Sequence, residues 1–130
     1  MGAWGAGPFD NDDAADLMME LEDVPSWDSI RFVFGEVLAN EDYVELPEGA
    51  RAWAAAALLT VAIGKSQISA QDYLATIEAM GPPPHDLIEM AHTALKRLST
   101  GDSEIRELYL DSGNYTAWLD LIAATEEALS

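Results

Sequence analysis

The most hydrophobic stretch of the chain reads Ala52-Trp53-Ala54-Ala55-Ala56-Ala57-Leu58-Leu59-Thr60-Val61-Ala62-Ile63. A helix with this sequence is apolar on nearly every side, which is typical of a helix in the middle of a bundle. Its alanines let neighbouring backbones approach closely, and Trp53 supplies one large anchor. Pro47 suits the first turn of a helix, and Gly64 suits its C-terminal end. The pattern therefore predicts a central helix over residues 47–63.

Amphipathic segments on both sides of this run predict the helices that surround it. Apolar residues recur at spacings of three and four, and no stretch shows the alternation of a strand. The expected helices span residues 12–22, 27–39, 69–80, 85–98, 103–110 and 115–129. The predicted fold is all-α, with one domain over residues 1–130. It consists of a compact bundle of six to seven helices (residues 10–130) and an extended Gly-rich N-terminal strap (residues 1–9).

Several expected helix starts carry side chains that accept hydrogen bonds from backbone N–H groups. The predicted caps are Asp10 or Asn11, Ser26, Ser69 with Asp72, and Asn114. Phe32 lies off the apolar stripe of the segment 27–39. We expect a wide buried face there, because single apolar residues beside a stripe are common. An exposed interface aromatic is the alternative.

The chain opens with Met1-Gly2-Ala3-Trp4-Gly5-Ala6-Gly7-Pro8-Phe9-Asp10-Asn11-Asp12-Asp13-Ala14-Ala15-Asp16. Its glycines allow the backbone to lie close to another surface, and Pro8 favours an extended path. Trp4 and Phe9 each offer on the order of 150–250 Å² of surface to bury. We therefore expect these two aromatics to dock the strap on the helices. A binding surface centred on Trp4 is the alternative.

This opening has the form Met-Gly-x-Trp-Gly-x-Gly-Pro-Phe-Asp-Asn-Asp-x-Ala-x-Asp. It resembles the start of a family of small bacterial proteins called domain of unknown function 4259. The end of the chain is similar to the same family in residues 103–109, 112–115 and 118–119. Leu17 departs from the pattern, since the family more often has Trp there. The resemblance implies a small, single-domain bacterial protein, and it brings no activity and no catalytic residue.

Charge is the strongest compositional feature of the chain. Twenty-four acidic residues face six basic ones, for a formal net charge of −18. Such a surface repels phosphate backbones and anionic lipid headgroups, so we expect neither nucleic acid nor a membrane as partner. It attracts basic proteins and accelerates their encounter. Solubility alone is the alternative reason for the charge.

The residue types that the chain lacks narrow its chemistry. It has no cysteine, which excludes disulfides, thiolate metal sites and cysteine nucleophiles and fits a reducing cytosol. The start has no basic region followed by an apolar core, so we expect no signal peptide. Residues 52–63 are too few to cross a bilayer, which takes about 20 apolar residues. We expect a cytoplasmic protein.

Two motifs with metal-ligand residues are incomplete. An EF-hand loop starting at Asp10 would need glycine where Ala15 stands and glutamate where Leu21 stands. Glu89-x-x-His92 has the spacing of di-iron bundles, but the second such motif is missing. No nucleophile elbow, P-loop or dinucleotide motif occurs. We therefore expect no cofactor, no metal and no catalytic residue, with a loose cation site near Asp10 as the alternative.

These observations favour a non-enzymatic acidic module that binds a basic protein, possible roles being those of an inhibitor or an immunity-type protein. The segment 12–22 and the loop 40–45 carry carboxylates without matching bases. The expected binding residues are Trp4, Asp12, Asp13, Asp16, Glu20, Glu41, Asp42 and Glu45. The alternative is a small cation-dependent hydrolase that uses the carboxylates of residues 10–16. A nucleic-acid mimic would need carboxylates spaced like phosphates along one face.

Overall fold

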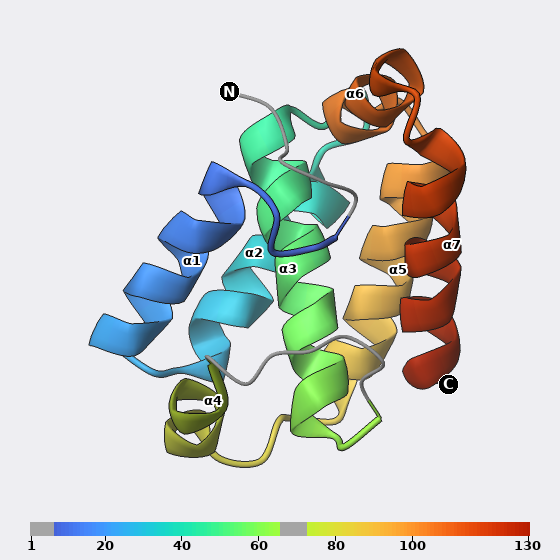
Figure 1. Cartoon of the computed structure of the whole chain (residues 1–130). Helices are drawn as coiled ribbons and strands as arrows, with labels where there is room; N and C mark the ends of the chain where they lie inside the picture. The colour runs from blue at the N-terminus through green and yellow to red at the C-terminus, as the bar shows by residue number, and fades with distance from the viewer. Residues whose placement is uncertain (1–6, 66–72) are drawn as a thin grey trace.

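The computed structural model describes residues 7–65 and 73–130, and within them the chain folds into helices joined by short turns (Figure 1). The helices are α1 (Asp12–Asp23), α2 (Trp27–Ala39), α3 (Leu46–Ala62), α4 (Leu74–Met80), α5 (Asp86–Thr100), α6 (Glu104–Ser112) and α7 (Tyr115–Ala128). These residues contain no strand, so the all-α prediction is confirmed. None of these helices combines the length and the apolar character that crossing a bilayer requires.

Helix α3 lies in the middle of the bundle and contacts each of the other helices (Figure 1). All side chains from Ala52 to Thr60 are buried, which confirms the predicted central helix. Gly49, in the first turns of α3, allows the closest approach. A Cβ atom there would lie 3.2 Å from Cγ2 of Ile105 and 3.3 Å from Cδ2 of Leu98. Small residues therefore let α5 and α6 pack directly on the α3 backbone.

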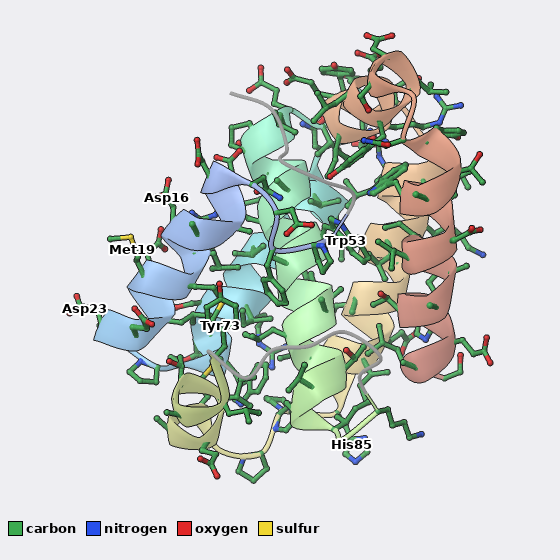
Figure 2. All side chains as sticks on the ribbon, in the orientation of Figure 1. Asp16, Met19, Asp23, Trp53, Tyr73 and His85 are labelled. Carbon is green, nitrogen blue, oxygen red and sulfur yellow. The ribbon has the colours of Figure 1, made fainter. Side chains whose placement is uncertain are left out.

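Large aromatic side chains fill the space that the alanines leave open. Trp53 and Trp118 are fully buried, and Figure 2 shows Trp53 projecting from α3 into the interior. The ring of Trp118 stacks on that of Tyr109 with 5.3 Å between centroids. Neither indole Nε1 of these two tryptophans has a hydrogen-bond partner within the described residues. Burial of their large apolar rings stabilises the core.

Side-chain caps begin three of the helices. Asn11 Oδ1 accepts from Ala14 N at 2.8 Å, and Ser26 Oγ accepts from Asp28 N at 3.1 Å. Both caps were predicted. Ser103 Oγ accepts from Arg106 N at 3.3 Å and begins α6. These bonds satisfy N–H groups that a helix start leaves without partners.

Other predicted helix ends have mixed outcomes. Asn114 precedes α7 as expected, but its side chain makes no capping hydrogen bond. Gly64 follows α3 with a φ of +76°, as a residue beyond a helix end commonly does. The predicted cap of Ser69 with Asp72 lies outside the described residues, and the structure begins α4 at Leu74.

The strap is described from Gly7 onward, and it crosses in front of α3 before α1 begins (Figure 1). Gly7 N donates to Asp10 Oδ2 at 3.0 Å, and Asp10 N donates to Gly7 O at 3.2 Å. A Cβ at Gly7 would lie 2.6 Å from that carboxylate oxygen, so a larger residue would displace the Asp10 side chain. Phe9 packs on Tyr73 with ring centroids 5.1 Å apart, as its docking role predicts. Trp4 lies outside the described residues.

The loop of residues 40–45 is held against the corner between α5 and α6. Val44 and Ser103 form an isolated parallel bridge, in which Val44 N donates to Asp102 O at 3.1 Å and Glu104 N donates to Val44 O at 2.8 Å. Arg97 donates from Nη2 to Asp42 O and from Nη1 to Asp102 O, both at 3.1 Å. One guanidinium thus ties the loop to the end of α5.

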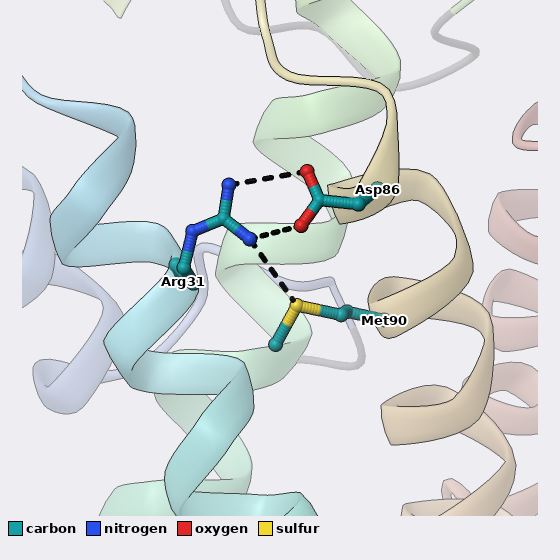
Figure 3. A network of polar contacts seen from close by, with 3 residues as sticks. All are labelled: Arg31, Asp86 and Met90. Atoms are coloured by element: carbon teal, nitrogen blue, oxygen red, sulfur yellow. Dashed lines mark hydrogen bonds and ion pairs between the residues drawn. The ribbon is translucent and has the colours of Figure 1, made fainter.

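Helix α2 is fixed against α5 on one side. Arg31 forms an ion pair with both carboxylate oxygens of Asp86 and also reaches the sulfur of Met90 (Figure 3). Its hydrogen bonds lower the pKa of Asp86. Trp27 Nε1 donates to Gly81 O at 2.9 Å at the start of the helix. Two side chains of α2 thus connect it to α5 and to the residue that follows α4.

Phe32 points away from the core. The prediction of a wide buried face on α2 is wrong, because 67% of Phe32 is exposed. The buried residues of this helix, among them Ile30, Val33 and Phe34, occupy one side, and Phe32 lies on the opposite side. The alternative, an exposed aromatic, describes the structure.

Candidate functional site

A group of charges lies where α1 and α2 pack on α3. Arg51 of α3 donates two hydrogen bonds to Glu20 of α1, from Nη1 to Oε2 at 3.0 Å and from Nη2 to Oε1 at 2.9 Å. These bonds raise the pKa of Arg51, and the nearby charges of Glu36 and Asp13 raise it further. We name the carboxylates around this arginine the acidic face: Asp12, Asp13, Asp16, Glu20, Glu36, Glu45 and Glu48.

The acidic face contains seven carboxylates and one arginine. Because a single positive charge cannot neutralise seven negative ones, the carboxylates repel one another. Partial burial raises the pKa of Asp13, and neighbouring aspartates of α1 raise it further. Partial burial likewise raises the pKa of Glu48, with additional contributions from Glu45 and Glu36. A raised carboxyl pKa means that the surroundings disfavour the charged form. Burial and the neighbouring carboxylates therefore both oppose the ionised forms of Asp13 and Glu48.

The predicted binding residues of α1 all belong to the acidic face; they are Asp12, Asp13, Asp16 and Glu20. Figure 2 shows Asp16 projecting outward, with Met19 and Asp23 along the same edge of α1. The expectation that this helix lacks a matching base is wrong for Glu20. Its side chain pairs with Arg51, and the hydrogen bonds lower the pKa of Glu20.

The three predicted binding residues of the loop 40–45 lie in two different places on the surface. Glu45 belongs to the acidic face through its proximity to Glu48. Glu41 and Asp42 are exposed on the part of the loop that docks against α5 and α6. There Tyr43 Oη donates to Glu107 Oε1 at 2.8 Å, and this bond raises the pKa of Tyr43 to about 12. The structure thus brings together five predicted residues, namely Asp12, Asp13, Asp16, Glu20 and Glu45.

Three members of this arrangement were not found from the sequence: Glu36, Glu48 and Arg51. Glu48 and Arg51 are one helical turn apart on α3, a spacing that indicates a shared face. No local pattern indicates that α1 and α2 both meet this face of α3. The missing information was the packing order of the helices.

Two polar side chains just before α1 accept hydrogen bonds from backbone N–H groups. Asp10 Oδ2 accepts from Gly7 N, and Asn11 Oδ1 accepts from Ala14 N. Within residues 7–65 and 73–130, no three His, Asp or Glu side chains are grouped to hold a metal ion. Asp10 and Asn11 therefore have local structural roles, Asp10 in the turn and Asn11 as the helix cap.

A comparison with protein families finds a match to "Domain of unknown function (DUF4259)" over residues 2–120. The chain belongs to the DUF4259 family. No curated protein and no solved structure matches it. The DUF4259 match extends from the strap into α7, so it includes every residue of the acidic face.

This DUF4259 protein also has a groove of about 420 Å³ beside α5. It is lined by His92, Thr93, Lys96, Arg97, Thr100 and Glu126. Thr93 Oγ1 donates to Glu89 O at 3.0 Å, and Thr100 Oγ1 donates to Lys96 O at 2.6 Å. Both hydroxyl protons are thus used within α5 itself, and these lining residues present no hydroxyl paired with a general base.

We expect the DUF4259 protein to become more stable as the pH falls from about 7 to about 5. Asp13 and Glu48 have raised pKa values in the fold, so protonation favours the folded state. Below about pH 4 the stability should decline, because Glu20 and Asp86 have lowered pKa values and lose their arginine pairs on protonation. The melting temperature should therefore rise before it falls.

Thermal unfolding followed by circular dichroism at constant ionic strength measures this profile. The variant with Asp13→Asn and Glu48→Gln should lose part of the rise and keep the decline. A melting temperature that only falls between pH 7 and 5 would contradict the expectation.

Proposed function

We propose that this DUF4259 protein is a non-enzymatic binding module that holds a basic protein partner through the acidic face. An inhibitor or immunity-type protein would act in this way. The observation that carries the proposal is the grouping of seven carboxylates, which repel one another, around the single guanidinium of Arg51, already paired with Glu20. Lysine or arginine side chains of a partner would relieve this repulsion, so binding would stabilise the charged carboxylates.

The distribution of charge also supports fast association. The formal net charge of −18 steers a basic protein from a distance, and the exposed Asp12 and Asp16 would meet it first. Rim charges of this kind chiefly set the association rate and its salt dependence. The same field repels nucleic acids and anionic membranes. The proposal includes a cytoplasmic location. A chain without cysteine forms no disulfides, so it does not depend on an oxidising compartment.

The test is affinity capture from the organism that encodes the protein, with quantitative mass spectrometry of the bound proteins. One variant combines Asp12→Lys, Asp16→Lys and Glu45→Lys on the acidic face. A matched control combines Asp111→Lys, Asp120→Lys and Glu127→Lys, which are exposed on α6 and α7 and change the net charge equally. Melting temperatures of both variants check that the fold is intact.

We expect basic proteins in the wild-type capture, reduced at least tenfold by the acidic-face variant and less than twofold by the control. Raising the salt concentration should weaken the capture by wild type and control alike. Equal capture by both variants, or captured proteins without basic character, would overturn the proposal.

A further inference from the structure

The outward face of α2 combines an exposed aromatic ring with flanking acids. Phe32 is 67% exposed, and Asp28 and Glu36 lie one turn before and one turn after it, both exposed. Gly35 lies on the same side, and nothing occupies the 4 Å around the position of its missing Cβ. Phe32 therefore stands beside open space, between two carboxylates.

This face is presented on a rigid helix. Arg31 binds Asp86 of α5, and Trp27 Nε1 bonds to Gly81 O (Figure 3). A partner that docks on Phe32 would not have to pay the entropy of ordering α2. Aromatic residues are enriched at protein interfaces, where a polar rim surrounds the buried anchors.

The face is continuous with the acidic face. Glu36 belongs to both, since its charge acts on Arg51 and Glu48. Asp28 and Glu36 are eight residue steps apart along the helix, or about 12 Å. Two basic side chains separated by two turns of a second helix match this spacing. A second copy of the chain fits poorly, because it would bring the same carboxylates against these ones.

We propose that the outward face of α2 docks an amphipathic basic helix of the partner. An apolar side chain of that helix packs on Phe32 and enters the space over Gly35. Its lysines or arginines pair with Asp28 and Glu36. This inference rests on the proposed function and adds the place and the secondary structure of the partner's contact.

The test uses two synthetic 18-residue probe peptides and backbone NMR titration of the full chain. The first probe is an amphipathic helix of leucine and lysine, and the second has serine in place of every leucine. Phe32→Ala removes the anchor, and Gly35→Gln fills the open space with a neutral side chain. Leu110→Ala is the matched control, since Leu110 is 45% exposed on α6.

We expect the leucine–lysine peptide to shift the amide signals of residues 28–36 and to bind at least tenfold tighter than the serine–lysine peptide. Phe32→Ala and Gly35→Gln should each abolish this tenfold difference, and Leu110→Ala should retain it. If both peptides bind equally to the wild type at the acidic face, the docking site on α2 is wrong while the proposed function stands. If neither peptide binds, both are wrong. Self-association that Phe32→Ala removes would make a second copy the occupant and would also overturn the inference.

Discussion

Replacement of Trp53 by alanine should lower the free energy of unfolding by about 3–5 kcal/mol, the usual loss for a buried tryptophan. Trp53 is fully buried on α3, which contacts every other helix. Its loss leaves a cavity that the surrounding alanines are too short to fill. Since domains of this size are stable by about 5–15 kcal/mol, the variant should be partly unfolded at physiological temperature. Urea denaturation followed by circular dichroism measures the change.

Phe32→Ala is the matched control for this substitution, because it also truncates an aromatic side chain on a helix. Phe32 is exposed, so its loss should change the free energy of unfolding by no more than about 0.5 kcal/mol. A loss below about 1 kcal/mol for Trp53→Ala would show that the core does not depend on this anchor.

Gly49→Leu should have the second largest effect, a loss of about 1–3 kcal/mol or more. A Cβ atom at this position already lies 3.2 Å from Ile105 and 3.3 Å from Leu98, so the rest of a leucine side chain has no space. The substitution would push α3 away from α5 and α6. Urea denaturation of the variant gives the loss, and a lower slope with urea would indicate looser packing.

Gly35→Leu is the matched control. It also replaces a helical glycine with leucine, but at a position without crowding, so it measures the effect of helix propensity by itself. Gly35 is in α2, and nothing lies within 4 Å of its missing Cβ. Leucine should therefore raise the free energy of unfolding by up to about 0.8 kcal/mol through helix propensity. If Gly35→Leu and Gly49→Leu change stability in the same direction, close helix approach at Gly49 is not the determining factor.

Features encoded within a few neighbouring residues were predictable from the sequence. The run from Ala52 to Ile63 indicated the central helix, because apolar residues on all sides require burial on all sides. Asn11 and Ser26 indicated helix starts, because their side chains reach backbone N–H groups only two or three residues away. Such signals do not depend on how distant parts of the chain meet.

Contacts between distant segments were not predictable in the same way. The pairing of Arg51 with Glu20 and the bridge between Val44 and Ser103 join residues that no local pattern relates. The exposure of Phe32 has the same origin, since it depends on which side of α2 packs against α3 and α5. Charge composition indicated an acidic surface, and only the helix packing shows that Glu36, Glu48 and Glu45 lie together on it.

The short side chains of α3 have a consequence for how relatives can diverge. Because the interior is built around one inner helix, the outward positions of α1 and α2 take little part in packing, as the exposure of Asp16, Met19 and Phe32 shows. Substitutions there would change the chemistry of the outer surface and leave the architecture intact. One scaffold can therefore carry many different surfaces, because separate sets of residues determine the surface and the packing.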